Sequence, residues 1–120
     1  MNIFSDDTKR LRFEDYVWIV FIILCIGNIV GNENEIKYIN LNDKFYKYNA
    51  DKIFDTVLSI TLIIYAYFLI RNYDAYKKVE DSKKKLYLVK LFGSTFVLVG
   101  SICLIYFQKN QSSFVGSPGI

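Results

Sequence analysis

The chain has 120 residues and a formal net charge of +3, and its residues are 52% hydrophobic, 18% aromatic and 22% charged. This composition is too apolar for a disordered chain, and the charge is too small for the basic footprint of a nucleic-acid-binding protein. With no histidine and two cysteines, the chain lacks the commonest general base and the ligands of a zinc site. We therefore expect no catalytic residues, metal, cofactor or nucleic-acid partner.

The chain is expected to form a single domain, 1–120. It contains three apolar segments, which cover residues 16–31, 53–70 and 86–107. A bilayer core about 30 Å thick requires about 20 apolar helical residues, which the second and third segments match and the first nearly matches. Their apolar residues surround the helix, whereas a helix of a soluble bundle has an apolar stripe and a polar face. We predict an all-α integral membrane protein with three transmembrane helices and a short cytoplasmic helical hairpin between the second and third.

A cleaved signal peptide is the alternative explanation of segment 16–31. Signal peptides begin with a basic region and end at small residues. Here Glu14 and Asp15 precede the apolar run, and Ile29 stands where a small residue is required. We therefore expect the segment to remain as a span.

The distribution of lysine and arginine predicts the orientation, because these residues favour cytoplasmic loops. Residues 1–15 and 71–85 together carry nine of them, whereas residues 32–52 and 108–120 carry five. We predict a multi-pass protein of the cell membrane with a cytoplasmic N-terminus and an external C-terminus.

Two external regions have different expected structures. The loop 32–52 is long for an unstructured connection, and Asp43 is placed to cap a helix that continues into the second span, so we expect the loop to be part extended and part helical. The tail 108–120 is rich in Ser and Gly and holds the only proline, which predicts a non-helical segment. Its apolar residues can dock against the bundle or the tail can fray, and the pattern leaves both open: Phe114, Val115 and Ile120.

The cytoplasmic loop 71–85 is short and compatible with helix. Asp81 or Ser82 is placed to cap the third helix. A run of bases makes the loop a candidate docking site for anionic lipid or an acidic partner, although a simple topology signal explains it as well. The candidate residues are Lys77, Lys78, Lys83, Lys84 and Lys85.

Polar residues within the predicted spans are candidates for function, because ionisable groups are costly in a bilayer. Under the predicted topology four of them converge at one depth and could bind a cation or relay a proton: Asn28, Asp55, Ser59 and Ser101. The structural alternative is that Asp55 stabilises the start of its helix and pairs with Lys52.

Small residues recur in two spans at spacings that suit close helix packing. Gly27 and Gly31 are four apart, and Gly93 and Gly100 are seven apart, as are Ser94 and Ser101, which returns them to nearly the same helix face. We expect packing within the chain. Cys25 and Cys103 are expected to be buried thiols, although a disulfide is geometrically possible.

Three functional hypotheses follow. The first is a membrane protein that acts through another membrane protein, as an accessory, regulatory or immunity-type subunit. The second is a homo-oligomeric channel or carrier for ions or small solutes that uses Asp55. The third, a membrane enzyme, lacks the usual acid–base residues. Lys, Asn, Ile and Tyr fill 47 of 120 positions, a bias typical of an AT-rich genome and hence of a low-GC bacterium.

Overall fold

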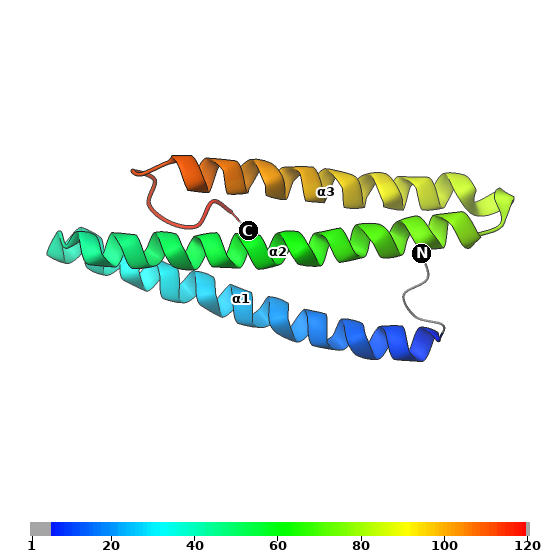
Figure 1. Ribbon diagram of the computed structural model, residues 1–120, viewed down its shortest axis with the longest axis horizontal. Coiled ribbons are helices and arrows are strands. Elements are labelled where there is room, and N and C mark those ends of the chain that lie inside the picture. The colour runs from blue at the N-terminus through cyan, green and yellow to red at the C-terminus, as the bar shows by residue number, and fades with distance from the viewer. Residues whose placement is uncertain (1–5, 120) are drawn as a thin grey trace.

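The computed structural model describes residues 6–119, which form three long helices joined by two tight turns (Figure 1). Helix α1 spans Asp7–Leu41, α2 spans Lys44–Lys78 and α3 spans Lys84–Asn110, and a short 3-10 helix, η1, spans Asp81–Lys83. The predicted all-α class is confirmed, and all three helices are long and apolar enough to cross a membrane. The 35 residues of α1 and of α2 measure about 52 Å, more than the bilayer core of about 30 Å.

The turn between α1 and α2 is shorter than expected, because residues 32–52 are almost entirely helical. Asn42 ends α1 in the left-handed conformation, with φ of 52°, and its N–H donates to the Tyr38 carbonyl at 2.8 Å. Asparagine tolerates this conformation. Asp43 caps α2 as expected, since its Oδ1 accepts a hydrogen bond from the Phe45 N–H at 3.0 Å. Both helices therefore continue beyond the apolar segments.

The turn between α2 and α3 is stabilised differently from the prediction. Neither Asp81 nor Ser82 caps the third helix, because η1 precedes it and Lys83 occupies the N-cap position without a side-chain hydrogen bond. Instead, Lys84 Nζ donates to the Tyr76 carbonyl at 2.6 Å. A base bound to the last carbonyls of a helix also interacts favourably with the helix dipole, so this turn is held at the C-terminus of α2.

Helix α2 is the centre of a single layer of helices. It packs against both neighbours, whereas α1 and α3 do not contact each other within residues 6–119. Figure 1 shows α3 running alongside α2, while α1 diverges from α2 toward the N-terminal end of α1. In the most apolar part of each helix, 28% of α2 is buried but only 11% of α1 and 6% of α3. The helices thus form an open layer and not a closed bundle.

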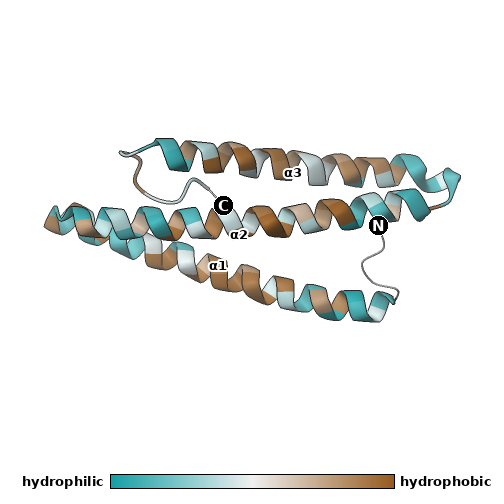
Figure 2. Ribbon diagram, viewed as in Figure 1, coloured by the Kyte–Doolittle hydropathy of each residue, from teal (hydrophilic) through white to brown (hydrophobic). Residues whose placement is uncertain are grey.

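The α1–α2 interface follows a spacing of three and four residues, which is typical of left-handed helix packing. Figure 2 shows that the middle of the layer is hydrophobic and both ends are hydrophilic. The buried and half-buried stripe nevertheless includes charged residues where it reaches each end. On α1 the stripe consists of Glu14, Val17, Phe21, Leu24, Asn28, Gly31 and Glu35, and on α2 it consists of Lys47, Ala50, Phe54, Val57, Thr61, Ile64, Phe68 and Arg71.

The C-terminal tail is non-helical, as predicted, and turns back toward α2 (Figure 1). The Phe114 ring lies 5.6 Å from the Phe107 ring, and the Phe114 carbonyl accepts a hydrogen bond from Lys47 Nζ at 2.6 Å. Of the two alternatives, the structure therefore shows Phe114 docked against the helices. Val115 is exposed, and the prediction for Ile120 falls outside the described residues.

Candidate functional site

The four polar residues expected to form one cluster lie in different surroundings. Ser59 is exposed, whereas Ser101 is only 1% exposed, and each hydroxyl donates to a carbonyl of its own helix. Asn28 lies on the α1 stripe. Asp55 is half-buried, and its Oδ1 is buried without a hydrogen-bond partner among the described residues. Ser59 and Ser101 thus differ in exposure, and Asp55 has a buried carboxylate oxygen without a hydrogen-bond partner among the described residues.

The two glycine pairs have different roles in the structure. Gly27 and Gly31 face α2: a Cβ on Gly31 would overlap the Phe54 ring, only 2.7 Å from its Cζ, and a Cβ on Gly27 would lie 3.1 Å from Val57. Gly93 and Gly100, in contrast, have open space where a Cβ would be. They pack against no helix of the described chain.

Ser94 and Ser101, which follow these glycines in the sequence, lie at the α2–α3 interface. Ser94 and Ser101 lie on the same face of α3, toward α2, and Gln108 continues this face at the same seven-residue interval. The Asn72 amide donates to the Ser94 hydroxyl, and Gln108 Nε2 lies 3.5 Å from Asp51 Oδ1. The seven-residue spacing was therefore informative, but the serine set and not the glycine set is the packing face.

The five candidate docking lysines do not form a uniform patch. Lys84 is bound to α2 carbonyls, and Lys78 pairs with Asp74 at 3.0 Å, a hydrogen bond that lowers the pKa of that carboxyl. Lys77 lies 5.0 Å from the centre of the Tyr73 ring. The exposed members of the set are Lys77, Lys78, Lys83 and Lys85.

The two cysteines are free thiols and both are exposed. Cys25 lies on α1 and Cys103 on α3, two helices that make no contact within the described chain. The expectation of buried thiols is therefore wrong, and the structure shows no disulfide between them. The reason is the open layer, which exposes helix faces that a closed bundle would cover.

A buried ion pair lies at the α1–α2 turn and was not predicted from the sequence. Lys47 Nζ lies 3.0 Å from Glu35 Oε1 and 3.2 Å from Asp51 Oδ1. Glu35 is 2% exposed and Lys47 9%, so both charges are almost completely removed from solvent. We call these three residues the Lys47 cluster. Buried charges persist only when they are paired, so this cluster fixes how α1, α2 and the tail meet.

A second charged group lies at the opposite end of the layer. Arg71 Nη1 donates to Glu14 Oε1 at 3.0 Å, Arg10 Nε lies 3.7 Å from Glu14 Oε2, and Tyr67 donates to the same oxygen at 3.0 Å. Glu14 is 5% exposed. We call Arg10, Glu14 and Arg71 the Glu14 cluster. Here two cations share one buried carboxylate, and Arg10 also lies 3.9 Å from the exposed carboxylate of Asp7.

Both clusters were missed for the same reason. The predicted spans 16–31 and 53–70 ended with the apolar residues, so all four of these charged residues lay outside them: Glu14, Glu35, Lys47 and Arg71. The signal that would have found them is the spacing, because Glu14 and Glu35 continue the α1 stripe and Lys47 and Arg71 continue the α2 stripe in register.

A groove of about 390 Å³ opens beside the Glu14 cluster, where α1 diverges from α2. Trp18 of α1, Phe68 of α2 and Val97 of α3 contribute its apolar lining, and the Trp18 and Phe68 rings stack at 5.2 Å. Arg71 and Lys90 bring two positive charges to it. The groove thus combines an aromatic surface with basic groups.

The described residues combine buried ion pairs with a groove lined by aromatic and basic side chains. Among residues 6–119, no three Cys, Asp or Glu side chains lie close enough together to hold a metal ion. Comparison with family models, with curated proteins and with solved structures finds no match for this chain. The geometry therefore defines the class of protein. It is all-helical, its three helices are long and apolar enough to cross a membrane, and a buried ion pair lies at each end of the α1–α2 interface.

Proposed function

We propose that this is a multi-pass membrane protein, from a low-GC bacterium, that acts by binding a different membrane protein as an accessory, regulatory or immunity-type subunit. Insertion is supported by three helices of sufficient length and apolarity. It is also supported by the hydrophobic middle and hydrophilic ends of the layer (Figure 2). The proposal requires no catalysis by the chain.

The proposed orientation places the N-terminus in the cytoplasm and the C-terminus outside. The start of α1 and the α2–α3 turn lie at one end of the layer, and the α1–α2 turn and the tail lie at the other (Figure 1). Because these pairs of regions share an end, the nine bases of residues 1–15 and 71–85 gather at one end of the molecule. Such an excess favours the cytoplasmic side.

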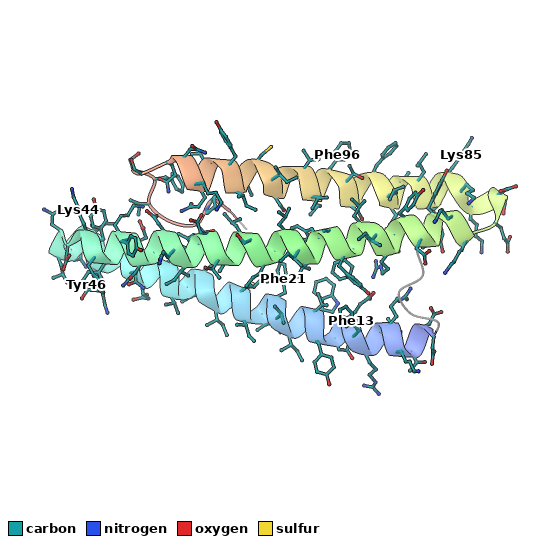
Figure 3. The ribbon with its side chains drawn as sticks, viewed as in Figure 1. Phe13, Phe21, Lys44, Tyr46, Lys85 and Phe96 are labelled. Carbon is teal, nitrogen blue, oxygen red and sulfur yellow. The ribbon has the colours of Figure 1, made fainter. Side chains whose placement is uncertain are left out.

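The observation that carries the proposed role is the open layer. Since α1 and α3 do not contact each other within residues 6–119, each leaves most of its apolar surface uncovered by this chain. Figure 3 shows Phe96 pointing away from α2, and this side chain is 73% exposed. Helix faces of this kind can bind helices of another membrane protein through close side-chain packing.

Site-specific cross-linking tests the role directly. A photoreactive amino acid replaces Phe96, and a matched variant carries it at Ile63, which is 68% exposed on α2. After gentle extraction from native membranes, we expect to recover the chain together with one different protein in stoichiometric amount. The yield of cross-linked product should be higher with the photoreactive residue at position 96 than at position 63. Recovery of the chain alone, or of homo-oligomers only, would contradict the proposal.

A second function, a homo-oligomeric channel or carrier, is favoured by Asp55. Its Oδ1 is buried without a hydrogen-bond partner in the described chain, which is costly unless another group binds it. A single layer of three helices cannot enclose a polar pathway, so copies of the chain would have to surround one.

The channel hypothesis makes a distinct prediction for Asp55→Asn. If Asp55 binds the transported cation or proton, flux into liposomes should fall at least about tenfold, because the substitution removes the charge and keeps the shape. Ser59→Ala is the matched control, since this exposed hydroxyl only donates to a carbonyl of its own helix. No flux in the unsubstituted protein, or equal flux in all three proteins, would exclude this function.

A further inference from the structure

We propose that the groove between α1 and α3 binds the phosphate headgroup of an anionic phospholipid. The proposal rests on the proposed insertion in a membrane and adds a specific ligand to it. It concerns Trp18, Phe68, Arg71, Lys90 and Ser94, which differ from the lysines of the 71–85 loop.

The shape of the groove follows from the layer. Because α1 diverges from α2 and does not reach α3, the α2 surface between them is left as the floor of a groove. Trp18 stands on one side, and Gly93 and Ser94 stand on the other. A Cβ on Gly93 would meet no atom within 4 Å, so the absence of a side chain there keeps this wall open.

The charge of the groove favours an anion. Lys90 pairs with no carboxylate among residues 6–119, and its ammonium lies 6.0 Å from the centre of the Tyr87 ring. Within residues 6–119, Arg71 pairs with one carboxylate, that of Glu14, and shares it with Arg10, which also lies 3.9 Å from Asp7 Oδ1. With Asp7 included, these five side chains carry a net charge of +1 in a partly desolvated place, where a phosphate can accept hydrogen bonds from guanidinium and ammonium groups.

The apolar half of the groove distinguishes a lipid from a small anion. Trp18 and Phe68 stack beside the two cations, and Val97 continues the apolar lining one helical turn beyond Ser94 and two turns beyond Lys90. Arg71 and Lys90 also lie near the ends of the apolar segments, at the basic end of the molecule. Basic pockets between membrane helices at this depth suit anionic headgroups, while the acyl chains remain among apolar side chains.

The native fluorescence of the protein provides the assay, because Trp18 is the only tryptophan and lies in the groove. The full chain is reconstituted in phosphatidylcholine vesicles that contain a small fraction of lipid with brominated acyl chains, which quench tryptophan at short range. We expect brominated phosphatidylglycerol to quench Trp18 more strongly than brominated phosphatidylcholine at the same mole fraction. Equal quenching by the two lipids would overturn the proposal.

Two pairs of variants test the groove itself. Gly93→Leu fills the groove, and its matched control is Gly100→Leu, a second open glycine outside it. We expect the first to abolish the preference for phosphatidylglycerol and the second to retain it. Lys90→Gln should reduce the preference about fivefold, because it removes a hydrogen bond to the lipid phosphate worth about 1 kcal/mol, whereas Lys83→Gln, outside the groove, should not.

Each remaining outcome has a defined meaning. If Lys83→Gln reduces the preference as much as Lys90→Gln does, general surface charge and not the groove attracts the lipid, and the proposal fails. If inorganic phosphate removes the preference, the groove is a small-anion site and the proposal also fails. If neither brominated lipid quenches Trp18, the chain is not inserted, and the proposed function itself fails first.

Discussion

Replacing Lys47 by Met is expected to lower the free energy of unfolding by about 3–5 kcal/mol, the usual cost of leaving a buried charge without its partner. Lys47 lies 3.0 Å from Glu35 Oε1, and Glu35 is only 2% exposed. The second oxygen of Glu35 already lacks a hydrogen-bond partner among the described residues. The substitution therefore leaves a buried carboxylate with neither solvent nor a cation. It also removes the hydrogen bond to the Phe114 carbonyl, which docks the tail.

Denaturation in mixed micelles measures this effect, with Trp18 fluorescence as the signal, because the Trp18 ring stacks on Phe68 across the α1–α2 interface. Lys52→Met is the matched control: Lys52 is exposed on the same helix, and its loss should cost at most about 0.5 kcal/mol. The double variant Glu35→Met with Lys47→Met should recover most of the lost stability, since no unpaired buried charge remains. Equal losses in the Lys47 and Lys52 variants would show that the ion pair has no structural role.

Gly31→Leu is the second substitution expected to have a large effect, with a loss of about 3 kcal/mol, toward the upper end of the usual range for overpacking. The Phe54 ring, 1% exposed, occupies the space where a Cβ would be. Accommodating a side chain requires α1 and α2 to move apart. This weakens the α1–α2 interface along the stripe that begins at Glu14 and ends at Glu35, so Trp18 fluorescence should change with it.

Two further variants distinguish close packing from a general effect of the glycine. Gly100→Leu meets open space in α3 and should be neutral or stabilising by up to about 1 kcal/mol, because leucine has the higher helix propensity. Phe54→Ala combined with Gly31→Leu should restore part of the lost stability by providing room for the new side chain. If the Gly31 and Gly100 variants have the same stability, the α1–α2 contact described above is incorrect.

The sequence predicted the helices much better than their ends. The apolar segments identified three helices, and the cap at Asp43 was anticipated because aspartate accepts from the first free N–H groups. Residues 32–52 were expected to be part extended and part helical. Those residues are helical because packing and the Lys47 cluster stabilise them, and composition alone does not report such tertiary contacts.

Candidate site residues were harder to predict, because polarity within a span does not show which direction a side chain faces. Ser59 was grouped with Ser101, yet one is exposed and the other is buried between helices. The three- and four-residue spacing of the stripe would have predicted two of the buried charges. Glu14 and Arg71 continue that spacing just outside the apolar segments. The groove beside them depends on the divergence of α1, which is a property of three packed helices and leaves no local pattern.

The most direct test of a three-span protein with a cytoplasmic N-terminus is the accessibility of single cysteines in intact cells. Cys25 and Cys103 are first replaced by serine, and a cysteine is then placed at an exposed position of each end: Lys44, Lys83 or Ser113. A membrane-impermeant maleimide should label Lys44→Cys and Ser113→Cys in intact cells and Lys83→Cys only after the membrane is opened. Labelling of Lys83→Cys together with Ser113→Cys in intact cells, or recovery of the chain outside the membrane fraction, would contradict the topology.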